Sequence, residues 1–216
     1  MKTVRILIAD DHEVAREGMR LLLERQPHWE VCGVAKTGRE AVEQAKTLRP
    51  DIVVLDMAMP ELNGLEAARQ IKRFLPTTEL LIFTGHEQED LIREVFDAGV
   101  KSYILKGDAS SHLVDAIRAL SEHKPFFTTK VSEVLFAKFM SGPGRDPAQG
   151  EERLTKRERE IVQLIAEGAS NKEVAQKLGV SLRTAESHRA NVLRKLNLGS
   201  VADLVRYAIR NNIIQA

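Results

Sequence analysis

Residues 51–64, DIVVLDMAMPELNG, decide how the first half of the chain folds. Residues 52–55 are a continuous apolar run, mostly β-branched, which is typical of a parallel strand that is covered on both faces. Asp56 follows where this run stops, and in open α/β sheets the ligand crevice lies at the carboxyl ends of the strands. Pro60 and Gly64 then mark a loop before the next helical pattern. Taken alone, the pattern fits two interpretations of Asp56 equally well: a residue of the ligand crevice, or a side chain that only caps a turn.

A strand followed by an amphipathic helix occurs five times along residues 1–123. The apolar runs that predict the strands lie at 4–9, 31–35, 52–55, 80–83 and 102–105. The helical spacing of apolar residues that predicts the helices lies at 14–22, 41–48, 65–72, 91–96 and 113–120. Five such repeats predict an α/β fold, a doubly wound parallel sheet with helices on both faces and right-handed crossovers.

Polar side chains follow four of the predicted strands, and in a parallel sheet these strand ends meet at one edge. They are Asp10 and Asp11, Asp56, Thr84 and Lys106. Clustered carboxylates repel one another unless a cation joins them, and Mg²⁺ prefers oxygen ligands. A cation beside Asp56 would let its carboxylate attack a phosphorus atom and form an aspartyl phosphate. Lys106 and Thr84 could then pair with the phosphoryl oxygens.

This part of the chain resembles the receiver domain of two-component response regulators. The residues that carry the resemblance are Asp10, Asp11, Asp56, Pro60, Gly64, Thr84, Tyr103 and Lys106. The resemblance implies a flavodoxin-like domain over residues 1–123, with the strand order 2-1-3-4-5. It implies that a sensor histidine kinase passes a phosphoryl group from its phosphohistidine to Asp56. It also implies a Mg²⁺ site made by Asp10, Asp11, Asp56 and the backbone carbonyl of Ala58.

A conformational switch is implied as well. The Thr84 hydroxyl would move to the phosphoryl group and the Tyr103 ring would turn inward. Ala58 and His86 occupy positions that tend to control how long the phosphoryl group lasts. Many receivers have proline after the lysine, whereas this chain has Gly107, so the resemblance does not predict the loop geometry there.

Composition and charge favour two domains. The chain has 216 residues, of which 43% are hydrophobic and 29% charged, with a net charge of +1. Residues 1–125 hold 17 Lys and Arg against 21 Asp and Glu, whereas residues 153–216 hold 12 against 6, which suggests a polyanionic partner for the second domain. No apolar run approaches the ~20 residues of a membrane span and no signal-peptide pattern opens the chain, which fits a cytoplasmic protein. The single cysteine, Cys32, excludes an internal disulfide, and its apolar neighbours predict a buried position.

Residues 124–152 separate the two predicted domains. Apolar residues at helical spacing predict an amphipathic helix over 129–140. Residues 141–150 contain three Gly and two Pro, which predicts a flexible linker.

Residues 153–216 predict a small all-α domain with a helix-turn-helix. Capping boxes at 155–158 and 170–173 start two helices, which Gly168 and Gly179 end. Ser181 can cap a third helix that runs to about residue 196. Two helices joined by a short turn that contains glycine are the helix-turn-helix pattern.

The third helix of this domain has two different faces at ~100° per residue. The arc predicted to face the core carries Ala185, His188, Val192 and Leu196. The opposite arc carries Arg183, Ser187, Ala190 and Arg194. A narrow polar stripe of this kind can enter the major groove of DNA. An ordinary solvated face would show the same pattern, but the basic charge of the domain favours DNA.

Residues 153–212 resemble the LuxR-type domain of the NarL/FixJ group of response regulators. The matching residues are Leu154, Thr155, Arg157, Glu158, Glu160, Gly168, Asn171, Lys172, Glu173, Ala175, Leu178, Ser181, Thr184, His188, Lys195 and Leu196. The resemblance implies that the third helix enters the major groove and that a fourth helix joins two DNA-bound copies. DNA contacts are expected from Lys172, Arg183, Thr184, Glu186, Ser187, Arg189, Ala190, Arg194 and Lys195. Dimer contacts are expected from Val201, Leu204, Val205 and Ala208.

The two resemblances together predict a transcription regulator that is switched by phosphorylation of Asp56. The expected partners are a sensor histidine kinase, double-stranded DNA with two half-sites, a second copy of the chain and RNA polymerase. The protein is expected to catalyse only its own phosphoryl transfer and dephosphorylation. The alternative from another class is a haloacid-dehalogenase-type phosphatase, whose nucleophile lies on the first strand and not on the third. A receiver that works without phosphorylation is a second alternative.

Overall fold

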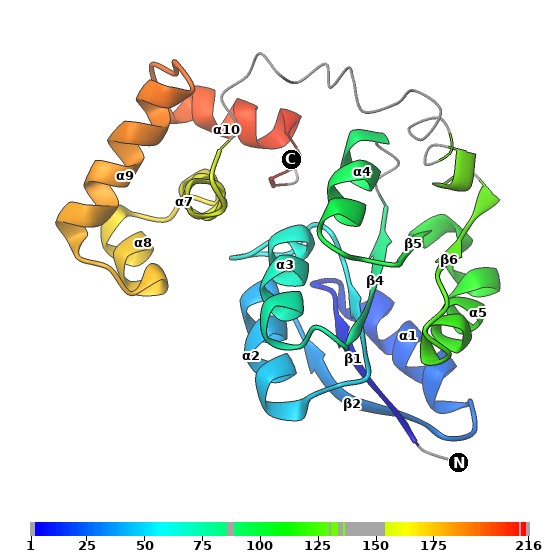
Figure 1. The fold of residues 1–216 in the computed structure, drawn as a ribbon. Coiled ribbons are helices and arrows are strands. Elements are labelled where there is room, and N and C mark those ends of the chain that lie inside the picture. Colours follow the sequence, from blue (N-terminus) through cyan, green and yellow to red (C-terminus); the bar gives the residue numbers. More distant parts are fainter. Residues whose placement is uncertain are drawn as a thin grey trace. The chain divides into compact units, whose positions relative to one another are not determined.

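The structure of the protein is a computed structural model that describes residues 3–85, 89–129, 131–133, 136, 154–211 and 213–214. The chain divides into two compact units, and each is described by itself (Figure 1). The predicted linker falls largely outside the described residues, so most of the helix predicted over 129–140 and all of the flexible stretch 141–150 stay predictions. In the part that is described, no helix has the length and apolarity needed to cross a membrane.

The N-terminal unit contains one sheet of six parallel strands, in the order β2-β1-β3-β4-β5-β6 (Figure 1). The strands are β1 (Val4–Ala9), β2 (Trp29–Ala35), β3 (Ile52–Leu55), β4 (Glu79–Thr84), β5 (Ser102–Leu105) and β6 (Phe126–Phe127). The helices are α1 (Glu13–Glu24), α2 (Gly38–Leu48), α3 (Gly64–Phe74), α4 (Glu89–Asp97) and α5 (Ala109–Ser121), and a 3₁₀ turn, Lys106–Asp108, precedes α5. The fold class, the five predicted strands and their order are confirmed.

The sixth strand was not predicted. Phe126 and Phe127 pair in parallel with β5, so the sheet continues into the segment that the sequence assigned to the linker. Two residues are too short a run to show alternation, which is why the sequence pattern did not predict this strand.

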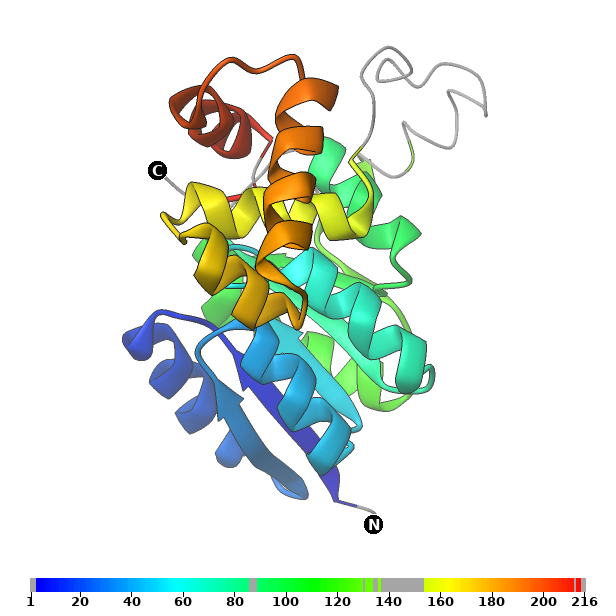
Figure 2. The ribbon, with the colours of Figure 1, turned by 90° about the vertical axis from the view of Figure 1, so that its left-hand side faces the viewer.

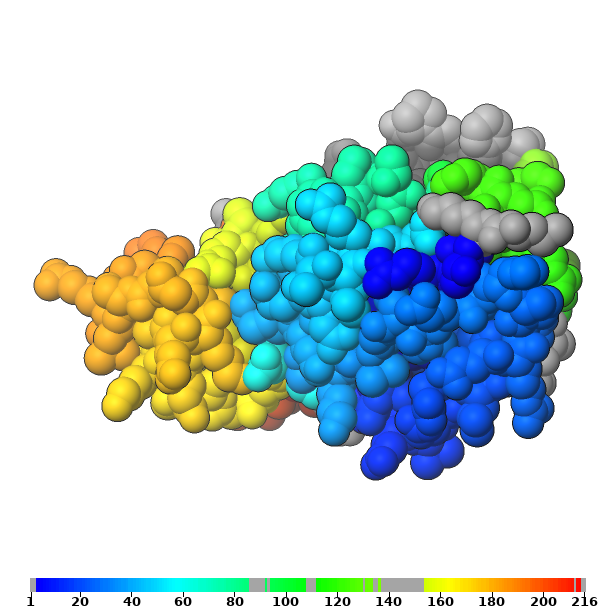
Figure 3. Space-filling model, turned by 90° about the horizontal axis from the view of Figure 1, so that it is seen from below, coloured from blue at the N-terminus to red at the C-terminus, as the bar shows by residue number. Residues whose placement is uncertain are grey.

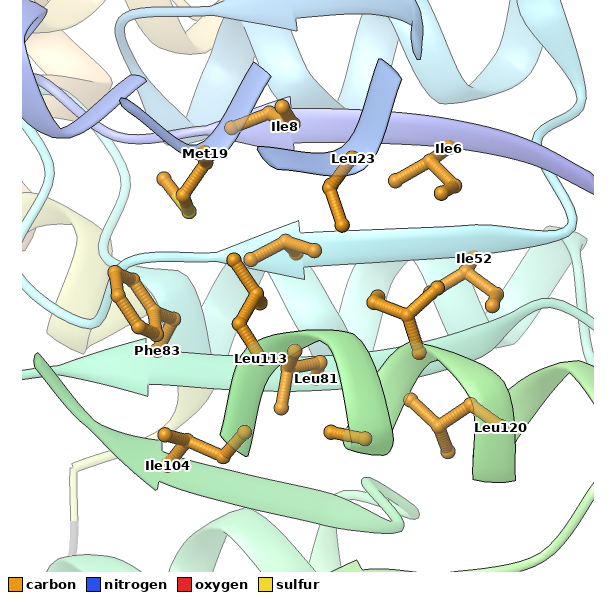
Figure 4. Packing of buried hydrophobic residues seen from close by; sticks show 13 residues of the cluster. Ile6, Ile8, Met19, Leu23, Ile52, Leu81, Phe83, Ile104, Leu113 and Leu120 are labelled. Carbon is orange, nitrogen blue, oxygen red and sulfur yellow. The ribbon is translucent and has the colours of Figure 1, made fainter. Parts of the chain in front are cut away.

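Helices α1 and α5 cover one face of the sheet. Alternate strand residues such as Ile8 and Ile104 pack there against Met19 of α1 and Leu113 of α5 (Figure 4). Helices α2 and α3 lie side by side on the other face (Figure 2). Because both faces are covered and all strands are parallel, the carboxyl ends of the strands form one edge that is open to ligands.

Helix α4 continues the layer formed by α2 and α3. Arg69 of α3 pairs with Glu94 of α4, with 3.5 Å between Nη2 and Oε2. Residues of β5 that point away from α5 therefore point to the side of the sheet where α4 lies.

Helix α1 forms as predicted, but the side of the helix that packs on the sheet is not the side that the spacing of its apolar residues predicted. Val14 is 87% exposed and Leu21 52% exposed, whereas Arg16, Met19 and Leu23 are buried. Apolar residues lie on more than one side of this helix, so spacing alone could not select the buried side. Cys32 also departs from its prediction, because β2 is an edge strand and the thiol is only partly buried.

The amino ends of β4 and β5 carry a charge cluster of their own. Figure 3 views the N-terminal unit from the end at which its strands begin. Glu79, the first residue of β4, is buried, and its Oε1 lies 2.9 Å from Lys101 Nζ and 2.9 Å from His123 Nδ1. Burial alone raises the pKa of Glu79, but hydrogen bonds from Lys101 and His123 outweigh it and hold the pKa below its usual value. These pairs join the starts of β4 and β5 to the turn after α5.

The described part of the C-terminal unit contains four helices, α7 (Lys156–Ala166), α8 (Asn171–Leu178), α9 (Leu182–Lys195) and α10 (Val201–Arg210). Both predicted capping boxes are present, with Thr155 and Ser170 as the N-caps. Gly168 and Gly179 have positive φ angles of 90° and 64°, as the ends of these helices require. Ser181 caps α9 as predicted. The core is made by residues of all four helices, among them Ile161, Val174, Val192 and Leu204.

Candidate functional site

Charged side chains that follow three strands meet at the carboxyl edge of the sheet. Asp10 follows β1, Asp56 follows β3 and Lys106 follows β5, as the sequence predicted. The Lys106 ammonium lies 2.8 Å from Asp10 Oδ2 and 3.0 Å from Asp56 Oδ2. Asp10 is 0% exposed and Asp56 1% exposed. One ammonium therefore bridges two buried carboxylates, and one negative charge of this trio remains uncompensated.

The edge has the donor set of a cation site. One possible ligand atom from each of Asp10, Asp11, His12 and Asp56 lies within 4.8 Å of all the others. Among the described residues, the buried Oδ2 atoms of Asp10 and Asp56 have no partner besides the Lys106 ammonium. Carboxylate oxygens that are buried with an excess of negative charge favour a hard divalent cation. The residues present therefore fit a metal ion.

The ionisation of the site follows from its burial. Burial raises the pKa of Asp56 from its ordinary 3.8 to about 6; the Lys106 ammonium opposes this rise, and the Asp10 charge adds to it. Burial lowers the pKa of Lys106, but its hydrogen bond to Asp10 and the charges of Asp56 and Asp10 outweigh burial and leave this pKa above its usual value. At neutral pH the lysine is charged and Asp56 is largely ionised.

Gly64 lets the loop after β3 close over Asp56. A Cβ atom at this position would lie 2.1 Å from the backbone oxygen of Asp56, which is far inside contact distance. The Gly64 amide donates to the carbonyl of Met57 at 2.8 Å, and the Met57 amide donates to Asp56 Oδ1 at 2.8 Å. Asn63 caps α3 by accepting from the amide of Glu66. The loop is therefore fixed at both of its ends, and it holds one carboxylate oxygen of Asp56.

The remaining predicted residues of this site lie at or beside the same edge. Thr84 is the last residue of β4, and Tyr103 lies in β5; both side chains are fully buried. Ala58 lies in the loop after Asp56 and is partly exposed. The described residues contain no cis peptide bond, so the bond between Lys106 and Gly107 is trans. His86 lies outside the described residues.

Two residues of the site were missed in the sequence. His12 Nδ1 lies 2.9 Å from Asp11 Oδ1 and 3.3 Å from Asp10 Oδ1, and the backbone amide of His12 donates to Asp10 Oδ1 at 2.8 Å. Arg16 is buried and donates from Nη1 to the backbone oxygen of Asp10 at 2.7 Å. A histidine directly after two aspartates was an available signal for His12. Arg16 had none, because an arginine on an amphipathic helix is usually solvated.

In the C-terminal unit, the predicted polar stripe of α9 is on the surface. Arg183, Glu186, Ser187, Ala190 and Arg194 are exposed, as is Lys172 of α8, and Thr184 is partly exposed. On the opposite arc Ala185 and Val192 are buried and His188 and Leu196 are partly buried. The two faces predicted for this helix are confirmed.

Two of the expected DNA contacts already have partners inside the unit. Arg189 Nη1 donates to Asn171 Oδ1 of α8 at 3.1 Å. Lys195 Nζ lies 2.9 Å from Glu158 Oε2 of α7, the same oxygen that accepts from the Thr155 amide in the capping box. Both side chains are partly buried. They hold α9 against its neighbours.

The dimer stripe expected on α10 needs correction. Leu204 and Ala208 are each 0% exposed and belong to the core of the unit. A side chain with no accessible surface cannot contact a second copy, so these two residues were wrongly assigned. Val201 and Val205 are partly exposed. The apolar residues of α10 at helical spacing therefore serve mainly to pack the helix on its own domain.

Comparisons with protein families match both units. Residues 6–118 match the response regulator receiver domain, and residues 152–208 match the bacterial regulatory proteins of the luxR family. The chain belongs to the LuxR-type response regulators. The receiver unit implies a histidine kinase as phosphodonor. This family assignment decides against the alternative of a haloacid-dehalogenase-type phosphatase.

Relatives of this response regulator match it along nearly the whole chain. It is 38% identical to the transcriptional regulatory protein LiaR of Bacillus subtilis, over 98% of this chain and 99% of LiaR. It is 37% identical to the response regulator protein VraR of Staphylococcus aureus, over 99% of this chain and 100% of VraR. Among solved structures, the RcsB response regulator of Salmonella typhimurium matches with a TM-score of 0.64 and 26% identity, over 96% of this chain and 97% of that chain. A complex of RcsB with DNA matches with a TM-score of 0.59 and 26% identity, over 95% and 98%.

Proposed function

We propose that Asp56 is the phosphoacceptor of this response regulator. The observation that carries the proposal is the position of Asp56, a buried carboxylate at a strand end whose Oδ2 contacts Lys106 and whose Oδ1 accepts from the Met57 amide. In the reaction, a carboxylate oxygen of Asp56 forms a bond to phosphorus while the bond between phosphorus and the kinase histidine breaks. Since the pKa of Asp56 is about 6, the attacking carboxylate is available at neutral pH.

We assign the cation site to Mg²⁺, held by Asp10, Asp11, Asp56 and the backbone carbonyl of Ala58. Mg²⁺ would neutralise the carboxylates and the negative charge of the incoming phosphoryl oxygens. Lys106 would exchange its contact with Asp56 for a phosphoryl oxygen, because a phosphoryl group on Asp56 would lie beside the ammonium. The protein would also remove its own phosphoryl group, with water entering past the small side chain of Ala58.

Thr84 and Tyr103 are proposed as the residues that convert phosphorylation into a conformational change. The Thr84 hydroxyl would donate to a phosphoryl oxygen, and the buried Tyr103 ring would occupy the space that this movement leaves. Both side chains belong to neighbouring strands, since β4 and β5 pair over residues 81–84 and 102–105.

We propose that the second domain, residues 153–216, carries the regulatory output by binding DNA. The receiver is assigned to residues 1–123, and β6 continues its sheet beyond that boundary. The exposed residues of α9 would enter the major groove, and Lys172 of α8 would contact a phosphate. Arg189 and Lys195 would contribute mainly by holding α9 in place. Phosphorylation would favour a homodimer on two half-sites, in which Val201 and Val205 of α10 contact the partner, and RNA polymerase would be the further partner in the cytoplasm.

Intact-mass measurement after incubation with phosphoramidate and Mg²⁺ tests the phosphoacceptor. The wild type is expected to gain one phosphoryl group, and Asp56→Asn none. The control is Asp51→Asn, which removes a carboxylate just before the same strand, where Asp51 accepts from the Arg5 amide. Asp51→Asn is expected to be phosphorylated like the wild type. A wild type that takes up no phosphoryl group, or an Asp56→Asn variant that still does, contradicts the proposal.

A further inference from the structure

Strand β6 covers the edge of β5, the strand that carries Tyr103. The Phe126 amide donates to the Lys101 carbonyl at 3.2 Å, and the Ser102 hydroxyl donates to the Phe126 carbonyl at 3.0 Å. The register pairs Ser102 with Phe126 and Tyr103 with Phe127. Nothing in the proposed phosphoryl chemistry requires this strand, so its position calls for another explanation.

The two phenylalanines of β6 lie on opposite faces of the sheet. Phe126 packs against the core cluster of α1 and α5, and its ring centroid lies 5.9 Å from that of His112 in α5. Phe127 points to the α4 side, where its ring meets Phe96 of α4 edge to face, with 5.0 Å between centroids. Paired residues of neighbouring parallel strands share a face, so Phe127 lies on the same side as Tyr103.

Phe127 therefore stands on the outer side of Tyr103. Without β6, β5 would be the edge strand of the sheet, yet Tyr103 is 0% exposed. Protein interiors are packed without voids large enough for a ring to turn freely. A Tyr103 ring that swings outward across β6 moves toward Phe127, whose ring packs on Phe96.

We propose that Phe127 is a positioning residue that couples the Tyr103 ring to the chain segment that leads to the DNA-binding domain. The ring and β6 move together: Tyr103 stays inward while Phe127 is docked on Phe96, and the ring leaves only when β6 shifts. The chain continues from β6 directly into a helical turn, in which the Ser132 amide and hydroxyl both donate to the Thr128 carbonyl at 3.0 Å and Val131 is buried. The inference rests on the proposed role of Tyr103 as a switch residue.

Fluorine NMR of the full-length protein labelled with 3-fluorotyrosine reports the environment of the Tyr103 ring directly. The chain has only two tyrosines, Tyr103 and Tyr207, so the signal of Tyr207 in the other domain serves as the internal reference. Phe127→Ala is expected to move the Tyr103 signal toward that of free 3-fluorotyrosine, because the ring gains an exposed position. Phe126→Ala is the matched control on the opposite face and is expected to leave the Tyr103 signal in place. Phe127→Leu restores most of the apolar volume and is expected to return the Tyr103 signal to its wild-type position.

DNA binding then tests the coupling. The probe is a duplex selected from random sequences by the phosphorylated wild type. The wild type is expected to bind it about 5- to 150-fold more tightly when phosphorylated, the usual range of allosteric coupling. Phe127→Ala is expected to bring this ratio to within about two-fold of one while its phosphoryl adduct still forms; Phe126→Ala is expected to keep the ratio.

A phosphorylated Phe127→Ala variant with the full wild-type ratio and an unmoved Tyr103 signal overturns the inference. If the wild type takes no phosphoryl group, the proposed function fails instead. In that case the Tyr103 signal of Phe127→Ala still decides whether Phe127 holds the ring.

Discussion

The residues proposed to act in the receiver and in the DNA-binding domain lie in opposite environments. In the receiver Asp10, Asp56 and Thr84 are buried, and their chemistry depends on that burial. In the second domain the residues that fit DNA are exposed on α9, and the partly buried charges, Arg189 and Lys195, hold helices together. A small phosphoryl group must be enclosed and its charge balanced at close range, whereas DNA is too large to be enclosed. Burial therefore accompanies the proposed phosphoacceptor in the first domain, whereas in the second domain it accompanies charged side chains that join helices.

The strongest test of this contrast lies on α10. Leu204→Ala is expected to lower the free energy of unfolding of the DNA-binding domain by about 2–5 kcal/mol, because it opens a cavity in the core. Val205→Ala, at the partly exposed neighbour, is expected to change stability much less and to weaken assembly on DNA with two half-sites. Urea unfolding and sedimentation with a two-site duplex measure the two effects. If Leu204→Ala left stability intact, α10 would not pack as described.

Gly64 tests the buried architecture of the receiver. Gly64→Ala is expected to destabilise the domain by about 1–3 kcal/mol and to slow phosphorylation, because a Cβ would collide with the Asp56 carbonyl. Gly18→Ala, in open space within α1, is expected to stabilise the domain by about 0.5–1 kcal/mol. Thermal unfolding and the rate of adduct formation distinguish the two variants. Equal effects of both substitutions would show that the loop over Asp56 can relax.

On α9, substitution of the exposed Arg183 and of Lys195, which is paired with Glu158, should have different effects on DNA binding and on stability. Arg183→Ala is expected to weaken binding to the selected duplex by about 1–3 kcal/mol and to leave the melting temperature unchanged. Lys195→Ala removes the pair with Glu158 and is expected to cost about 0–1 kcal/mol of stability. Fluorescence anisotropy at several salt concentrations and thermal melting provide both numbers. Undiminished binding by Arg183→Ala would remove the stripe from the proposed interface.

The pH dependence of stability tests the burial of Asp56 itself. Because the Asp56 pKa rises from 3.8 to about 6 on folding, the folded state holds this proton more tightly than the unfolded chain between those values. The free energy of unfolding therefore falls as pH rises through this window, with a slope that corresponds to at most one bound proton. Asp56→Asn lacks this term, so the free energy of unfolding of wild type minus Asp56→Asn should decrease from pH about 4 to about 6. Urea titrations without divalent cations measure it, and a flat difference would mean that Asp56 is not desolvated.

Patterns that repeat along the chain were sufficient to predict much of this protein. Residues 52–56 predicted a buried strand that ends on a carboxylate, and the polar residues at the ends of β1, β4 and β5 predicted which side chains share an edge. Capping boxes at Thr155 and Ser170 predicted where α7 and α8 begin. Such features are local, since backbone geometry and hydrogen-bonding groups within a few residues determine them.

Only the tertiary structure decided which apolar or charged residues are buried. Val14 and Leu204 are both apolar and at helical spacing, yet one faces solvent and the other fills a core, because the packing partner comes from elsewhere in the chain. Arg16 reaches the Asp10 carbonyl only because α1 folds back on β1. Phe127 stands beside Tyr103 only because β6 pairs with β5, across a separation of 24 residues in the chain. The sequence by itself determined the chemistry available at the strand ends, and the fold determined which neighbours control it.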